Sequence, residues 1–171
     1  GGIQERGLRA GIENVPAIVG MGVAADLARA EMDQRINHLR GLQKKLAEEL
    51  PRRIPYLRFL GHPTERLPGN VSVAVEFIEG EAMLLFMDME GIQISSGSAC
   101  ISRSLKVSHV MLAMGVDAAT AQGSLLFSFG MENKEDDLGR VLQVLPPVVE
   151  KLRNMSPVYR KAMAKKAEAA G

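Results

Sequence analysis

Two segments of the chain alternate apolar and polar side chains, and this period of two constrains the fold more than any other feature. In residues 71–77 the apolar positions are Val71, Val73, Val75 and Phe77. In residues 124–129 they are Leu125, Phe127 and Phe129, with Leu126 on the other face between two serines. A strand with this pattern buries one face against a core. Residues 56–60 and 92–94 are shorter strand candidates, so the chain predicts a small, largely antiparallel sheet.

Apolar residues at helical spacing flank these strands. A long helix is predicted to begin after Asn14, which is a good N-cap, and to end at Pro51. Further helices are predicted over residues 81–89 and 134–155, the latter interrupted by the proline pair at 146–147. Helices and strands in this order predict an α+β layer, with the helices on one side of the sheet.

Composition excludes several classes of function. The 171 residues carry 21 basic and 20 acidic side chains, and this balance argues against binding to nucleic acid or to an anionic membrane. The three histidines have no metal-ligand spacing, so no metal site is expected. A single cysteine excludes an internal disulfide and is typical of a reducing compartment, so we expect a cytoplasmic protein. The first residues lack periodicity and an initiator methionine, so we expect the C-terminal piece of a longer protein.

The single cysteine, Cys100, ends a run of small residues, Ser-Ser-Gly-Ser-Ala-Cys, at positions 95–100. Small neighbours disfavour burial in an apolar core and favour a mobile loop. Arg103 and Lys106 follow closely, and nearby cations stabilise the thiolate, which is the nucleophilic form. Free cysteines are more often buried as small hydrophobes, so on these residues alone a reactive thiol and a buried one both stay open.

Four motifs, in order along the chain, carry a resemblance to a known enzyme family. The chain opens with Gly-Gly-Ile-Gln-Glu-Arg-Gly-Leu-Arg-Ala-Gly-Ile-Glu-Asn-Val-Pro, and residues 66–72 read Arg-Leu-Pro-Gly-Asn-Val-Ser. The other two are the run at 95–100, with Ser-Leu-Lys-Val-Ser-His-Val at 104–110, and Ser-Phe-Gly at 128–130. Over essentially its whole length the chain resembles the cysteine desulfurases of the NifS/IscS type.

This resemblance implies a homodimeric enzyme of the class V aminotransferase family, with the α/β fold of fold-type I pyridoxal-phosphate enzymes. Residues 1–31 would be the end of the large domain and the start of the crossing helix. Residues 32–171 would be the α+β C-terminal small domain, with a mobile cysteine loop at 95–104. The family converts L-cysteine to L-alanine. Cys100 would form the persulfide and pass its sulfur to an acceptor such as an iron–sulfur scaffold protein.

Three departures from the family pattern concern the cofactor and the substrate. The family's cofactor lysine, in a His-Lys pair, lies upstream of the opening motif, and none of the eight lysines here follows a histidine. Ile12 replaces a threonine that contacts the cofactor phosphate, at a loss of roughly 1 kcal/mol. Leu126 replaces an arginine that binds the substrate carboxylate. The loss of this paired contact should weaken substrate binding by more than the roughly 1 kcal/mol lost at Ile12. We therefore expect neither cofactor-binding nor substrate-binding residues in this chain, and no activity of the chain alone.

Two other hypotheses stay open. The chain could be a non-catalytic sulfur carrier or partner subunit, derived from a desulfurase and lacking its own pyridoxal-phosphate site. In that case Cys100 would accept a persulfide from another protein. The chain could also be a structural remnant that dimerises with an intact subunit, and its thiol would then be inert.

Overall fold

The computed structural model describes residues 1–96 and 107–168. The chain divides into two compact units, Gly1–Arg35 and Ile36–Gly171, and helix α2 (Met32–Arg53) contributes to both. Every buried apolar side chain of the described residues belongs to the second unit. That unit therefore holds the core, and it positions the sheet on which the candidate site is built.

The first unit contains a short 3-10 helix, η1 (Glu5–Gly7), and helix α1 (Val15–Ala30). As predicted, Asn14 caps α1, because its side-chain oxygen accepts a hydrogen bond from the Ala17 N–H at 3.2 Å. The predicted long helix is two helices, since Glu31 leaves the helical conformation with φ −103°. No glycine or proline marks this break in the sequence. Helix α1 buries none of its residues.

Three antiparallel strands form the sheet in the order β1 (Leu57–Phe59), β2 (Asn70–Val75) and β3 (Ser124–Ser128). They confirm three of the four strand predictions. The prediction for residues 92–94 is wrong, because that segment is not a strand. The chain joins the sheet only at the next residue, Ser95, through an isolated bridge.

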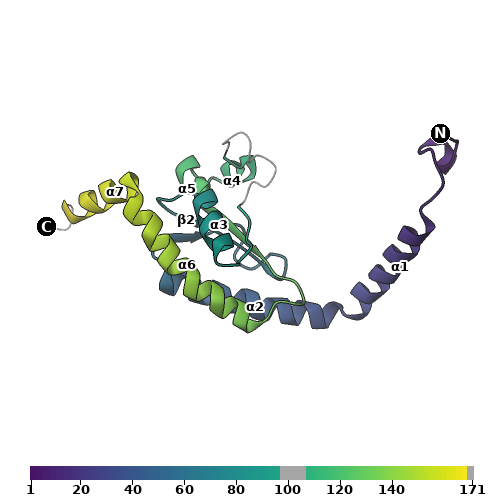
Figure 1. Ribbon diagram of the computed structural model, residues 1–171, viewed down its shortest axis with the longest axis horizontal. Helices are drawn as coiled ribbons and strands as arrows, with labels where there is room; N and C mark the ends of the chain where they lie inside the picture. Colours follow the sequence, from purple (N-terminus) through teal and green to yellow (C-terminus); the bar gives the residue numbers. More distant parts are fainter. Residues whose placement is uncertain (97–106, 169–171) are drawn as a thin grey trace. The chain divides into compact units, whose positions relative to one another are not determined.

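One face of the sheet carries the main core. Helices α2, α3 (Gly80–Met89) and α6 (Glu135–Met155) pack on it, and Figure 1 shows α3 beside α6. Val73 of β2 lies opposite Leu125 of β3, and both are fully buried, as their alternation predicts. The helices contribute Leu42, Leu46, Leu50, Met83, Met87, Leu138 and Leu145. Burial of each such side chain contributes about 1.5–3 kcal/mol, so this core accounts for most of the unit's stability.

Helices also lie on the opposite face of the sheet, so the expectation of helices on one side is wrong. They are α4 (His109–Ala113) and α5 (Ala118–Gln122). Ala74 alternates with Val73 and therefore faces away from the main core. It is fully buried in a second cluster, which consists of Leu60, Ala74, Met111, Val116 and Ala121. The small alanine side chain lets the two short helices approach the sheet closely.

Helix α6 continues through the proline pair at 146–147, where the sequence predicts an interruption. Each proline removes one main-chain donor. Leu145 and Val149 are buried on either side of the pair, and their packing holds the helix on the sheet. Helix α2 likewise includes Pro51, and a final helix, α7 (Pro157–Glu168), follows α6.

Candidate functional site

The predicted nucleophile, Cys100, lies outside the described residues, as do Arg103 and Lys106. The described chain stops at Ser96 and resumes at Val107. The part of the candidate site that the structure describes is therefore Ser95 and the surface of strand β3 to which it is bonded. The run of small residues at 95–100, which ends in Cys100, is called the cysteine segment below.

Ser95, the second residue before positions 97–106, is hydrogen-bonded to the middle of strand β3. Ser95 N–H donates to the Leu126 carbonyl at 3.2 Å, and Leu126 N–H donates to the Ser95 carbonyl at 2.7 Å. On its other side Leu126 pairs with Ser72 of β2. The bridge thus holds Ser95, the first residue of the run at 95–100, beside Leu126, where the sequence analysis expects the position of a carboxylate-binding residue. Sequence reasoning missed this contact, because a pairing across 31 positions leaves no local signal.

Leu126 is the one large apolar side chain on its face of β3. Ser124, which is buried, and Ser128, which is exposed, share that face. Leu126 itself is half-buried and belongs to neither of the two buried clusters. Its side chain carries no hydrogen-bond donor, so it cannot bind a carboxylate as an arginine would.

The motif at residues 66–72 forms the turn that leads into strand β2. Gly69 adopts a left-handed φ of 76°, and a Cβ atom there would lie 3.2 Å from the carbonyl oxygen of Phe129. Phe129 N–H donates to the Gly69 carbonyl at 2.9 Å. Gln43 of α2 donates to the Asn70 carbonyl at 2.7 Å. The glycine in this motif therefore permits the close approach of the chain that follows β3.

Ile12, at the position of the family's phosphate-contacting threonine, lies in the first unit and is 87% exposed. With Arg9 and Asn14 it lines a pocket of about 390 Å³. Arg9 lies 3.9 Å from the Glu13 carboxylate, and the Asn14 side chain is used as the helix cap. The side chain of Ile12 offers a phosphate neither donor nor charge. Position 12 thus does not supply the side-chain contact to the phosphate of pyridoxal phosphate that the family pattern expects there.

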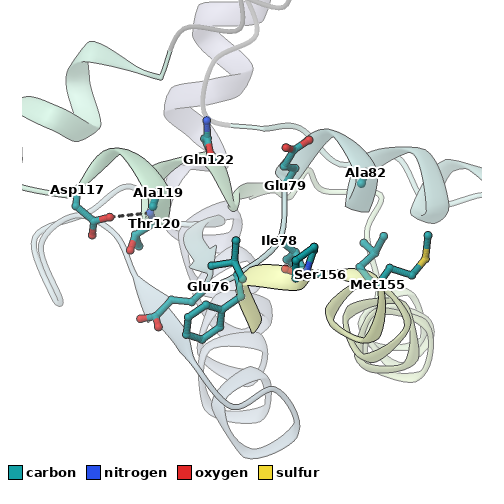
Figure 2. Close-up of a pocket in the computed structure, with 14 residues that line it drawn as sticks. Glu76, Ile78, Glu79, Ala82, Asp117, Ala119, Thr120, Gln122, Met155 and Ser156 are labelled. Atoms are coloured by element: carbon teal, nitrogen blue, oxygen red, sulfur yellow. Dashed lines mark hydrogen bonds between the residues drawn. The ribbon is translucent and has the colours of Figure 1, made fainter. Parts of the chain in front are cut away.

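A separate pocket of about 530 Å³ in the second unit is shown in Figure 2. Its carboxylates belong to Glu76, Glu79 and Asp117. Asp117 Oδ1 accepts a hydrogen bond from Thr120 N–H at 2.9 Å, which holds the pKa of Asp117 below its ordinary value. Neither Ile12 nor Leu126, the two predicted positions that the structure describes, lines this pocket. It is therefore not the site that the sequence predicts.

The described part of the chain holds neither a candidate metal site nor a membrane-spanning helix. Its His, Asp and Glu residues form no group of three that could hold a metal ion. Its helices include none that is long and apolar enough to cross a membrane.

Comparisons with known proteins agree with the motifs. The family described as aminotransferase class-V matches residues 3–141. A cysteine desulfurase from Gluconacetobacter diazotrophicus is 51% identical over 97% of this chain and 42% of that protein. Cysteine desulfurase IscS 1 from Archaeoglobus fulgidus is 47% identical over 94% of this chain and 42% of its own length. The chain therefore spans about two fifths of the length of the curated relatives it matches.

Solved structures share the fold. A NifS-like protein from Rickettsia africae superposes with a TM-score of 0.77 and 27% identity, over 88% of this chain and 39% of that one. Another NifS-like protein has a TM-score of 0.75 and 31% identity, over 89% of this chain and 38% of its own. These matches confirm the predicted fold class, in which the small antiparallel sheet and its helices are part of a fold-type I structure.

Proposed function

The chain belongs to the aminotransferase class-V family, and from this premise we propose that it is the C-terminal part of a cysteine desulfurase. The whole protein would convert L-cysteine to L-alanine and hold the sulfur as a persulfide on Cys100. Relatives that carry this name and match more than nine tenths of the chain support the proposal. The structural observation that carries it is the bridge between Ser95 and Leu126, which joins the start of the run at 95–100 to the strand on which the resemblance expects a substrate-binding arginine.

In this proposal residues 1–31 end the large domain and begin the crossing helix, while residues 32–171 form the small domain with the cysteine loop at 95–104. Helix α1 supports the assignment, because its apolar side chains are uncovered and need another surface to bury them. Pyridoxal phosphate, when bound by residues outside this chain, supplies an electron sink. The whole protein would act in the cytoplasm as a homodimer.

The proposed role of Cys100 is a sulfur transfer in two steps. Its thiolate attacks the sulfur of L-cysteine, so a sulfur–sulfur bond forms and the carbon–sulfur bond of the substrate breaks. The electron pair of the broken bond passes to the β-carbon, which takes up a proton, so that the sulfur is oxidised to a persulfide and the carbon is reduced to the methyl group of L-alanine. The terminal sulfur of the persulfide then passes to the thiolate of an acceptor, such as an iron–sulfur scaffold protein, and the Cys100 thiolate is regenerated. Arg103 and Lys106 would favour that thiolate.

Ile12 and Leu126 favour a second candidate function, a non-catalytic sulfur carrier or partner subunit. Both replacements remove contacts to the cofactor or the substrate and leave Cys100 in place. As a carrier, Cys100 would attack the terminal sulfur of a persulfide on another protein and release that protein's thiolate. No cofactor takes part in such an exchange.

Incubation of the full-length protein with L-cysteine and a thiol acceptor distinguishes these functions. A desulfurase releases alanine and transfers sulfur in equal amounts, and Cys100→Ala abolishes the transfer. A carrier makes no alanine but takes up labelled sulfur from a persulfide donor protein. A Cys100 thiol that reacts slowly with alkylating reagents, and is inert in both assays, supports the structural remnant. Turnover that survives Cys100→Ala with a protein acceptor removes Cys100 from its role.

A further inference from the structure

Arg153, near the end of helix α6, is the one charged side chain buried in the described part of the chain, with 4% of its surface exposed. Nε and Nη2 both donate to the carbonyl of Glu76, and Nη2 also donates to that of Tyr56, each at 3.3 Å. These contacts are longer than the usual N–H···O distance of about 2.9 Å. The rings of Tyr56 and Tyr159 lie 5.6 and 5.5 Å from the guanidinium carbon. The charge is thus contacted directly by neutral groups, through long hydrogen bonds and ring contacts, while the Glu76 carboxylate acts on it from beyond ion-pair distance.

None of the ion pairs among the described residues includes Arg153, although the charge of the Glu76 carboxylate favours its protonated form. Burial lowers the pKa of Arg153, but an arginine in a protein stays protonated. The Nη1 atom of Arg153 makes no hydrogen bond to the described residues, and it is not among their fully buried atoms that lack a partner, so it is accessible to solvent. Burial of a charge without an ion pair is costly. An anion from solution that accepts a hydrogen bond from Nη1 would therefore stabilise the buried charge of Arg153.

Arg153 lines a pocket of about 400 Å³ beside helix α6. Arg53, at the end of α2, lines the same pocket, and its guanidinium is half-exposed while it contacts Glu49 at 3.2 Å. Glu150 supplies the one carboxylate among the described residues that line the pocket, and Arg53 and Arg153 supply two guanidinium groups, of which that of Arg53 is paired with Glu49. The proline pair at 146–147 adds an apolar wall without N–H groups.

We propose that this pocket binds a small oxyanion, either inorganic phosphate or the phosphate group of a metabolite. Guanidinium groups bind such anions through paired, charge-assisted hydrogen bonds. Arg153 supplies a donor that its own packing already orients, and Arg53 supplies the second charge. The site lies wholly within the second unit, and it requires neither Cys100 nor the desulfurase reaction.

Calorimetric titration of inorganic phosphate into the cofactor-loaded, full-length protein tests the proposal, with chloride at equal ionic strength as the reference. We expect saturable binding that Arg53→Gln weakens about tenfold. Arg52→Gln is the matched control, because Arg52 also contacts Glu49 but does not line the pocket. Glu150→Gln should strengthen binding, since it removes the one negative charge. Phenyl phosphate that binds more tightly than phosphate identifies a metabolite, whereas equal or weaker binding identifies the free ion.

Absence of saturable phosphate binding would overturn the proposal. Equal weakening by Arg52→Gln and Arg53→Gln would overturn it too, because the effect would then come from surface charge in general. Both arginines are exposed, so circular dichroism should show that their variants remain folded.

Discussion

Ser95 and Leu126 exchange two main-chain hydrogen bonds, with N···O distances of 3.2 and 2.7 Å, although they are 31 positions apart. Strand β3 is held at its other edge by β2, so the bridge gives the chain leading to Cys100 a defined starting point. It also connects the motif at 95–100 to strand β3, whose last residue, Ser128, begins the motif at 128–130.

Replacement of Ser95 by proline should impair sulfur transfer, because proline has no N–H to donate to Leu126. We expect the rate of alanine formation by the full-length protein to fall roughly tenfold or more at saturating L-cysteine, since a small displacement of a nucleophile has a large effect on rate. Ser95→Ala keeps both main-chain bonds and should behave as the wild type. Equal rates for the two variants would contradict the positioning role.

Leu126→Arg should restore a guanidinium group that can make two hydrogen bonds to the substrate carboxylate. We expect the KM for L-cysteine to fall by about tenfold or more in the full-length protein, measured by alanine release. Leu126→Met, which conserves volume without adding charge, should leave KM close to that of the wild type. An unchanged KM in the arginine variant would show that this position does not meet the substrate.

The core of the second unit predicts a contrast between two leucines. Leu46 is fully buried beneath the sheet, so Leu46→Ala should lower the free energy of unfolding by about 2–5 kcal/mol. Leu85 on α3 is 62% exposed. Leu85→Ala should therefore change the free energy of unfolding by no more than about 0.5 kcal/mol. Urea unfolding followed by circular dichroism measures both, and similar losses would contradict the assigned core.

The cap of helix α5 predicts a pH dependence of stability. Because the hydrogen bond from Thr120 lowers the pKa of Asp117 below its ordinary 3.8, the folded state binds this proton less readily than the unfolded state. The contribution is therefore present above the unfolded pKa and is lost as pH falls through the folded pKa. Asp117→Asn keeps an acceptor oxygen but does not titrate. The difference in unfolding temperature between wild type and variant should become smaller as the pH is lowered from about 6 to about 3. A difference that stays constant over this range would contradict the proposed contribution of the ionised Asp117 cap.

Much of the fold could be predicted because it depends on local periodicity. Alternation in residues 71–77 correctly places Val71, Val73 and Val75 on the buried face, but Phe77 lies beyond the strand with a φ of 73°. Helical spacing correctly predicts the buried side of α6. The break at Glu31 and the continuity of α6 through its prolines depend on packing, which no local pattern records. The role of Cys100 stays a prediction.

The sequence by itself determined the family, through four motifs in a fixed order, and the face of strands β2 and β3 that packs on the main core, through the period of the pleat. Only the tertiary structure decided that Ser95 joins β3 at Leu126, that α4 and α5 cover the second face of the sheet, and that Arg153 is buried without an ion pair among the described residues. The physical reason is that these contacts join residues far apart in the chain. They exist only after the core has brought those segments together.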